Sequence, residues 1–389
     1  MKNNKNDNLP RIFFVGQYPG VFNKIKSPYK SETYSSEWND RSFFGENGGN
    51  RGNLVWQESV FRIFSYDTLN SRTGSFKELY ENRKNIDDEF DFIILNMACW
   101  INDRLFQPHS FFNSTLKFKK CKVISLGNGC ENNQYLNSNP NLSKSFFHPS
   151  VLETLKWISD NVEIFSVRGE STKQTLKEIL NIDSVALGCP SAYAFPNSIN
   201  NISLPSFEDS ILATASYLNP NSPHLKVFNQ FKSTNYFSQS YFGFDSPSNI
   251  EFPPGTNISD IVDVKINEAN GEVLNYPFKI DGIDKIYASN DVDNWRGVLS
   301  MHDYYIGSRI HCSILSLQAG IFPFIYYDDE RPLEIASLIG MPHLNSKIHD
   351  SYKLDEIFNE ANLNFFKQKY LKQFNLFKKT MNASGLSLR

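Results

Sequence analysis

Short apolar runs that lead into glycine constrain the fold of this chain more than any other feature of its sequence. Three examples are residues 12–15 before Gly16, residues 122–126 before Gly127-Asn128-Gly129, and residues 184–187 before Gly188. Segments with apolar residues at helical spacing lie between these runs. Buried strands that alternate with amphipathic helices are typical of parallel sheets with helices on both faces. The sequence therefore predicts the α/β fold class.

The same alternation resumes after residue 205, so we expect two α/β domains. The predicted strands are residues 12–15, 92–95, 122–126, 163–167, 184–187, 211–217, 285–288, 304–306 and 321–327. The predicted helices are residues 53–64, 151–159, 171–180, 293–301, 312–318 and 333–339. Residues 195–205 are rich in Asn, Ser and Pro, which predicts an interdomain linker. We expect an N-terminal domain over residues 1–200, a C-terminal domain over 206–350 and a helical tail over 351–389.

The composition argues against several classes of protein. A net charge of −3 without a basic block argues against a nucleic-acid binder, and a hydrophobic content of 40% argues against disorder. No apolar run reaches the roughly 18 residues that span a bilayer, and the first residues lack the pattern of a secretory signal peptide. Five cysteines without a CxxC pair predict neither a disulfide framework nor a zinc site. We therefore expect a cytoplasmic protein.

The segment from residue 306 to residue 320 is the most informative for chemistry. A strand is predicted to end at Ile306, Gly307 and Ser308 to form a tight turn, and a helix to begin near His311. Arg309 and His311 are two residues apart, so in an extended turn both side chains point the same way. A guanidinium binds phosphate or carboxylate, and a histidine titrates near neutral pH. The pair suits a small anionic substrate that gains a proton, although a salt-bridged arginine and a helix-capping histidine also fit the spacing.

A second strand end carries Arg168, in the stretch Ser-Val-Arg-Gly-Glu-Ser-Thr that starts at Ser166. There the guanidinium is placed to bind an anion at the mouth of the N-terminal domain. The alternative is a surface pair between Arg168 and Glu170, with Ser171 as the cap of the following helix.

A glycine-rich loop over residues 45–53 precedes the first predicted helix. It matches neither the P-loop nor the dinucleotide fingerprint, and it is either a flexible loop or one whose backbone amides approach a ligand. Its candidate binding residues are Gly49, Asn50, Gly52 and Asn53. The pair Asp291 and Asp293 resembles a metal-binding DxD motif, but its place before a helix favours capping.

Residues 306–342 closely resemble the signature of the polysaccharide pyruvyl transferase family. That signature is a strand, a Gly-x-Arg-x-His turn, an apolar helix that ends in Ala-Gly, a second strand, and a helix that ends before Gly-x-Pro. Residues 50–60, 166–176 and 187–195 match further family blocks in the right order. The first of these blocks has Gly52-Asn53 where the family more often has Gly-Asp.

The resemblance implies two Rossmann-like domains in a glycosyltransferase-B-like arrangement, with a C-terminal helix that packs back on the N-terminal domain. It also implies transfer of the enolpyruvyl unit of phosphoenolpyruvate to a sugar of a cell-surface polysaccharide or its precursor, which forms a pyruvate ketal and releases phosphate. Arg168, Arg309 and His311 match residues that surround phosphoenolpyruvate in the family, and Gly307 and Ser308 lie on the same turn. His311 is then the expected catalytic acid or base, and no metal or organic cofactor is implied.

Two other functions remain open at this point. One is a nucleotide-sugar glycosyltransferase of the same architecture, with Glu334 available for the ribose. The other is a non-catalytic sugar-binding protein. The acceptor sugar, the hydroxyls that are bridged, a lipid-linked form of the acceptor and the oligomeric state are not set by the sequence.

The tail carries an aromatic stripe at helical spacing, with lysines at the other positions. The stripe consists of Phe366, Tyr370, Phe374 and Phe377. Because burial of each aromatic side chain is worth roughly 1.5–3 kcal/mol, packing against the N-terminal domain is the expected role. Peripheral contact with anionic lipid is the alternative.

Overall fold

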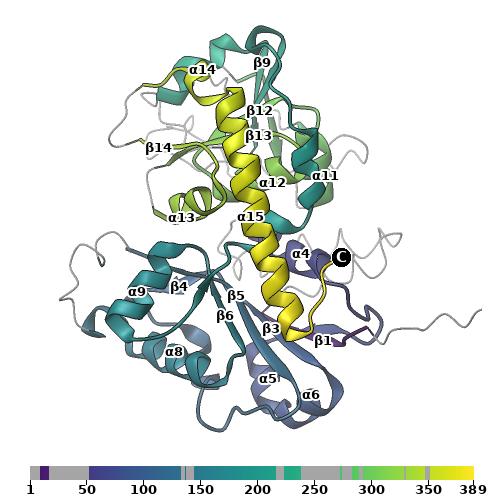
Figure 1. Ribbon diagram of the computed structural model, residues 1–389, viewed down its shortest axis with the longest axis vertical. Helices are drawn as coiled ribbons and strands as arrows, with labels where there is room; N and C mark the ends of the chain where they lie inside the picture. Colours follow the sequence, from purple (N-terminus) through teal and green to yellow (C-terminus); the bar gives the residue numbers. More distant parts are fainter. Residues whose placement is uncertain are drawn as a thin grey trace, which may run out of the picture. The chain divides into compact units, whose positions relative to one another are not determined.

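The computed structural model describes residues 9–16, 52–132, 136, 144–215, 223–237, 272–273, 283–288, 292–327, 330–346 and 351–389 (Figure 1). The chain divides into two compact units. Unit 1 contains the first strand, Gln57–Ala194 and Lys372–Arg389, and unit 2 contains Phe195–Leu371 with the start of the first helix. The division falls between Ala194 and Phe195, and the two units share the C-terminal tail.

Unit 1 is built on a parallel sheet with the order β2-β1-β3-β5-β6-β7, in which β4 pairs with β5. Its strands are β1 (Ile12–Val15), β2 (Arg72–Gly74), β3 (Phe92–Asn96), β4 (Cys99–Ile101), β5 (Lys122–Cys130), β6 (Ile164–Val167) and β7 (Val185–Ala186). All four residues of β1 have no exposed surface. A strand that is buried on both faces has apolar residues at every position, and this pattern is why β1 could be predicted from the sequence.

The helices of unit 1 connect these parallel strands. They are α4 (Asn53–Ile63), whose first residues belong to unit 2, α5 (Phe76–Glu81), α6 (Arg83–Glu89), α8 (Pro149–Asn161) and α9 (Glu170–Leu180). α8 begins at Pro149, a residue suited to the first helical position, and buries Val151, Leu155 and Ile158. α9 ends at Asn181, which adopts a left-handed conformation with φ 54°.

Unit 2 is built on a second sheet with the order β10-β11-β9-β8-β12-β13-β14. Its strands are β8 (Ile211–Ala215), β9 (Ser233–Phe237), β10 (Glu272–Val273), β11 (Lys285–Ala288), β12 (Tyr304–Gly307), β13 (Phe322–Tyr327) and β14 (His343–Asn345). All neighbours are parallel except β10 and β11. Its helices α11 (Val292–Leu299), α12 (Ile310–Ala319) and α13 (Glu330–Ile339) connect these strands. The prediction of two α/β domains is confirmed.

The strand order of unit 2 reverses between β8 and β12. The chain runs outward from β8 through β9 to β11, then returns to place β12 on the other side of β8 and continues to β13 and β14. In open α/β sheets, ligands bind outside the carboxyl ends of the strands at such a reversal. The turn that follows β12 therefore lies at the position where this fold class offers a binding site.

The tail forms α14 (Leu354–Ile357) and the 25-residue helix α15 (Glu360–Ser384). In unit 2 the Phe366 ring lies 5.5 Å from the Phe322 ring. In unit 1 the Phe377 ring lies 5.0 Å from Tyr193 and 6.5 Å from Phe64. The expected packing of the tail on the N-terminal domain is confirmed, and α15 contributes to both units. Within the described ranges, no helix has the length and apolar character needed to cross a membrane.

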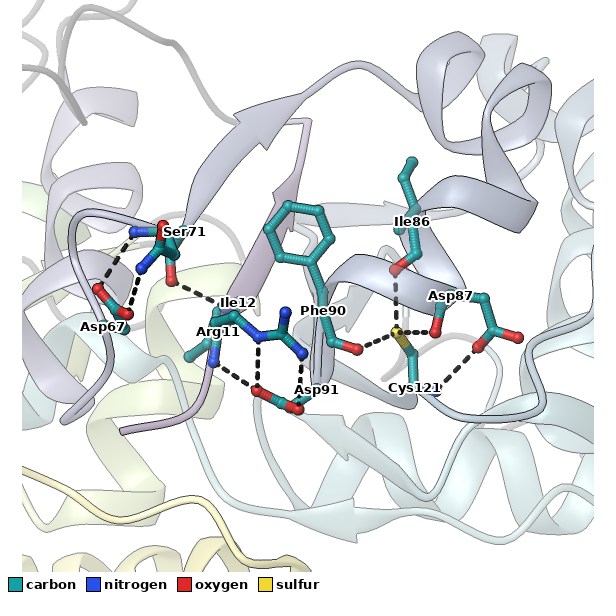
Figure 2. A network of polar contacts seen from close by, with 10 residues as sticks. Arg11, Ile12, Asp67, Ser71, Ile86, Asp87, Phe90, Asp91 and Cys121 are labelled. Carbon is teal, nitrogen blue, oxygen red and sulfur yellow. Dashed lines mark hydrogen bonds and ion pairs between the residues drawn. The ribbon is translucent and has the colours of Figure 1, made fainter. Parts of the chain in front are cut away.

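Polar contacts close the amino-terminal edge of the sheet in unit 1 (Figure 2). Asp91, just before β3, accepts a hydrogen bond from the main-chain N–H of Arg11, just before β1, at 2.8 Å. Asp87 accepts one from the main-chain N–H of Cys121 at 2.9 Å, and the Cys121 thiol donates to the carbonyl of Phe90. Arg168, which follows β6, lies at the other, carboxyl-terminal edge of this sheet.

Candidate active site

The turn after β12 differs in detail from the sequence prediction. Gly307 is the last residue of β12, and α12 begins at Ile310 with Arg309 as its N-cap in an extended conformation. His311 is therefore the second residue of the helix and not part of an extended turn. Arg309 and His311 are both half-buried, whereas Ile310 between them is buried. The helical start turns the apolar residue inward and leaves both polar side chains with access to solvent.

Main-chain hydrogen bonds attach this turn to the end of β8. The N–H groups of Ser308 and Arg309 donate to the carbonyl of Ala215 at 3.1 and 3.2 Å. Because Ala215 is the last residue of β8, these bonds span the two strands at which the strand order reverses. The candidate residues are thus held by backbone contacts at the ligand-binding edge of the sheet.

Gly307 and Tyr305 hold the turn close to the end of β8. A Cβ at residue 307 would lie 2.4 Å from the carbonyl oxygen of Ala215 and 2.6 Å from the Tyr305 hydroxyl oxygen, so only glycine fits there. The Tyr305 hydroxyl donates to the carbonyl oxygens of Ala215 and Arg309, at 3.2 and 3.1 Å. Complete burial raises the pKa of Tyr305 well above its ordinary value, so the phenol keeps its proton and remains a donor.

Arg168 follows β6 in unit 1 and is 5% exposed. Its Nε donates to the carbonyl of Gly127 at 2.9 Å, and its Nη1 donates to the Cys99 thiol at 3.0 Å. Its main-chain N–H donates to the carbonyl of Asn128 at 2.8 Å. Glu170 forms an ion pair with Lys173, and the N-cap of α9 is Gly169, not Ser171.

Arg168 contacts a bulge in β5. The pairing of β5 with β6 shifts between Ser125 and Asn128, and Gly127 takes a left-handed φ of +67°. Glycine adopts this conformation without the steric cost that a side chain brings. The sequence predicted a strand that ends at residue 126, directly before residues 127–129, whereas β5 continues to Cys130; the contact of these residues with Arg168 was missed. The Gly-Asn-Gly triplet directly after an apolar run was the available signal.

Asn128 anchors this bulge from inside the unit. Its side chain is fully buried, accepts a hydrogen bond from the indole N–H of Trp100 at 2.8 Å and donates to the carbonyl of Ser166 at 2.7 Å. One side chain thereby connects β4, β5 and β6. Buried polar groups that are bonded in this way fix a unique local geometry.

The family profile described as polysaccharide pyruvyl transferase matches residues 48–330 of this chain. The match covers most of the chain and includes both Arg168 and the turn after β12. The chain belongs to the polysaccharide pyruvyl transferase family. The resemblance noted from the motifs is therefore confirmed.

Comparison with curated proteins finds no match for this family member. Among solved structures, it is similar to the UDP-GlcNAc 2-epimerase of Neisseria meningitidis bound to UDP-GlcNAc, at 12% identity and a TM-score of 0.45, over 96% of this chain and 99% of that one. An α-glucosyltransferase in complex with UDP and DNA has 8% identity and a TM-score of 0.41, over 97% and 100%. The glycosyltransferase SnogD from Streptomyces nogalater has 7% identity and a TM-score of 0.35, over 97% and 98%.

The glycine-rich loop of this pyruvyl transferase family member is described only at its end. Gly49 and Asn50 lie outside the described residues. The carbonyl of Gly52 accepts a hydrogen bond from the N–H of Val55 at 3.1 Å, and Asn53 begins α4. The two residues thus form the start of the helix.

The other candidates from the sequence occupy structural positions. Asp291 lies outside the described residues, and Asp293, in the first turn of α11, forms an ion pair with Arg296. Glu334, considered for a ribose contact, lies in α13 and is 7% exposed.

Proposed function

We propose that this chain transfers the enolpyruvyl unit of phosphoenolpyruvate to a sugar of a cell-surface polysaccharide or its precursor. The products are a cyclic pyruvate ketal on the sugar and inorganic phosphate. The observation that carries the proposal is the Gly307–His311 turn, which lies at the strand-order reversal of unit 2 and within the family match. We place the reaction in the cytoplasm, because the spacing of the five cysteines predicts no disulfide framework.

Arg309 and Arg168 are the proposed ligands for the donor's two anionic groups. Phosphoenolpyruvate carries a carboxylate and a phosphate, and a guanidinium binds either one through two parallel hydrogen bonds. Each arginine follows a strand of its own sheet, at the carboxyl-terminal edge. Ser308, on the same turn as Arg309, adds a hydroxyl, and Gly307 lets the turn lie close to β8.

His311 is the proposed proton donor and acceptor. Protonation of the donor's methylene carbon forms the methyl group and leaves an oxocarbenium-like centre at the adjacent carbon. A sugar hydroxyl attacks that carbon and loses its proton. Phosphate then departs with the electrons of the C–O bond, and a second hydroxyl closes the ketal as it loses its proton. A positioned side chain typically accelerates such proton transfers by roughly 10²–10⁴-fold.

The glycine-rich loop is the proposed acceptor side of the site. Backbone amides in such loops approach sugar hydroxyls closely because glycine brings no side chain. Gly49, Asn50, Gly52 and Asn53 are the residues we assign to this role. The acceptor is a sugar with two hydroxyls close enough to share one ketal carbon, whether free or lipid-linked.

Binding of the donor is tested by calorimetry with phosphoenolpyruvate and with a panel of UDP-sugars. We expect binding of phosphoenolpyruvate by the unaltered protein and a loss of about tenfold or more in Arg309→Gln and Arg168→Gln, because a charge-assisted contact is worth roughly 1.5–3 kcal/mol. Arg83→Gln is the matched control, since Arg83 begins α6, contacts Tyr80 of α5 and is not assigned to the donor site. Its affinity should be unchanged.

Turnover is tested by release of phosphate from phosphoenolpyruvate in the presence of a panel of pyranosides. Release that depends on an acceptor, with a mass gain of the acceptor equal to one ketal-linked pyruvate, supports the proposal. Unchanged affinity in both arginine variants contradicts the assigned donor site. Binding of a UDP-sugar in place of phosphoenolpyruvate supports the glycosyltransferase alternative, and binding without phosphate release from any acceptor supports a non-catalytic sugar-binding protein.

A further inference from the structure

Cys99 stands apart from the other cysteines of the chain. All five lie among the described residues; Cys121, Cys130, Cys189 and Cys312 are buried, whereas Cys99 is half-buried. Cys99 is the first residue of β4 and pairs with Gly129 of β5. Its thiol sulfur lies 3.0 Å from Nη1 of Arg168. The most accessible thiol of the chain therefore touches a proposed donor-binding residue.

Two hydrogen bonds of the Arg168 guanidinium lie in its plane. Nε donates to the carbonyl of Gly127, which the bulge in β5 turns toward Arg168, and Nη1 donates to the sulfur of Cys99. A guanidinium is rigid and planar, so two bonds to neighbouring nitrogens determine its orientation. Loss of the contact to Cys99 removes one of these two constraints and leaves the bond from Nε to the carbonyl of Gly127.

Gly129 makes room for this arrangement. A Cβ at residue 129 would lie 2.6 Å from the sulfur of Cys99 and 3.0 Å from Cδ of Arg168. Any side chain there would displace the thiol, the stem of the arginine or both. The space that Gly129 leaves is filled by the thiol of Cys99 and the stem of Arg168, so the packing of β5 brings the two side chains together.

We propose that Cys99 is a positioning residue that fixes the orientation of the Arg168 guanidinium for the anionic donor. The inference rests on the proposed function for the identity of that donor, phosphoenolpyruvate. Cys99 acts through Arg168 and does not itself take part in bond making or breaking. Chemical modification of its thiol should therefore disable donor binding.

The first experiment tests the contact without any substrate. The rate at which iodoacetamide alkylates Cys99 is measured against pH by peptide mass spectrometry, in the unaltered protein and in Arg168→Gln. The thiolate is the reacting form, and a neighbouring arginine stabilises it. We expect the pH of half-maximal rate to rise by about one unit in the variant, since one unit corresponds to a modest charge interaction. An unchanged midpoint overturns the proposal.

Buried Cys121 is the internal reference in the same digest. Burial and the nearby Asp87 and Asp91 carboxylates raise the pKa of the Cys121 thiol to about 12. Its alkylation should be negligible near neutral pH in both proteins. This reference distinguishes local access to Cys99 from general unfolding caused by the Arg168 substitution.

The second experiment tests the consequence for the donor. Cys99→Ala should raise the KM for phosphoenolpyruvate about fivefold and leave kcat within about twofold. A misaligned Arg168 guanidinium weakens binding of the donor more than it slows the chemical step. Cys99→Ser, which keeps an acceptor, should restore the KM. In an Arg168→Gln background, Cys99→Ala should have no further effect. Cys121→Ala is the control for loss of a thiol.

The outcomes separate this inference from the proposed function. Independent, additive effects of Cys99→Ala and Arg168→Gln on KM overturn the positioning role, as does an unaltered KM in Cys99→Ala. Phosphoenolpyruvate should also slow alkylation of Cys99 in the unaltered protein, and full labelling at saturating donor contradicts the proposal. Failure of the unaltered protein to turn over phosphoenolpyruvate contradicts the proposed function, whereas the shift of the alkylation midpoint still reports on the Cys99–Arg168 contact.

Discussion

Gly307 faces the carbonyl oxygen of Ala215 so closely that a Cβ at residue 307 would lie 2.4 Å from that oxygen. The two residues are partners in the pairing of β12 with β8. Their approach brings the turn with Arg309 and His311 against the end of β8. A glycine that motif analysis associates with substrate binding thus acts first through the backbone geometry of the sheet.

Gly307→Ala should therefore reduce both stability and donor binding. The added methyl group must displace the Ala215 carbonyl or the Tyr305 hydroxyl, and overpacking of this kind costs roughly 1–3 kcal/mol. Urea unfolding and calorimetry with phosphoenolpyruvate measure the two effects. Gly297→Ala is the matched control, because among the described residues no atom outside its own stretch of helix lies within 4 Å of its Cβ position, and alanine is the better helix former in α11. Equal stability of the two variants would contradict the packing argument.

His311→Gln should lower kcat by roughly 10²–10⁴-fold and leave the KM for phosphoenolpyruvate little changed, because glutamine keeps hydrogen-bonding groups but transfers no proton. Steady-state phosphate release with an excess of acceptor measures both constants. His343→Gln is the control, since His343 begins β14 and its Nδ1 is hydrogen-bonded to the carbonyl of Met341. Parallel losses in kcat and affinity, or a fully active His311→Ala variant, would remove the catalytic assignment.

Asp87 should make the stability of unit 1 sensitive to acid. Burial opposes ionisation of this carboxyl, but hydrogen bonds from the main-chain N–H groups of Cys121, Lys119 and Lys120 outweigh it and hold the pKa of Asp87 below its ordinary value. Figure 2 shows the bond from Cys121. A carboxyl whose pKa is lower in the folded state than in the unfolded chain stabilises the fold. This stabilisation is fully present at pH values above the pKa of the carboxyl in the unfolded chain, which is about 4. That contribution is lost as the pH falls through the folded-state pKa.

Asp87→Asn should therefore cost about 1 kcal/mol of unfolding free energy at pH 7, and the difference from the unaltered protein should shrink below pH 4. Urea unfolding at pH 7, 5 and 3 measures it. Asp88→Asn is the matched control, because Asp88 forms only an exposed pair with Lys120 and such pairs contribute little. A difference that grows toward low pH would have the wrong sign for this explanation.

Phe377→Ala should destabilise the protein by roughly 3–5 kcal/mol, the usual cost of removing a fully buried aromatic ring. Phe377 packs against Tyr193 and Phe64 in unit 1. Phe365→Ala, on the same helix, should have a small effect, since Phe365 is 57% exposed. Thermal unfolding of both variants provides the comparison.

Removal of all residues after Asn364 separates the packing role of α15 from contact with lipid. Packing predicts an insoluble or easily melted protein, because the buried rings of Phe366, Tyr370 and Phe377 are lost together. A soluble truncated protein that keeps its melting temperature and only loses binding to anionic vesicles would instead assign α15 to a membrane surface.

The sequence alone predicted the strands that are buried on both faces and the helices between them. β1 is a continuous apolar run, and β3, β6 and β13 are mainly apolar and fully buried; such a pattern has few other structural solutions. Short strands escaped detection. β2 and β14 have three residues each, all of them half-buried, so neither shows a hydrophobic run.

Only the tertiary structure decided how the candidate residues are held. The Gly-x-Arg-x-His spacing identified Arg309 and His311, but their placement at a reversal of strand order depends on the pairing of β8 with β12, about 90 residues apart in the chain. The contacts of Arg168 depend in the same way on β4, β5 and β6. Local sequence encodes which segments become strands and helices through backbone propensity and hydrophobic periodicity. Which distant strands become neighbours, and hence which atoms meet at a glycine such as Gly129, is set by packing of the whole sheet.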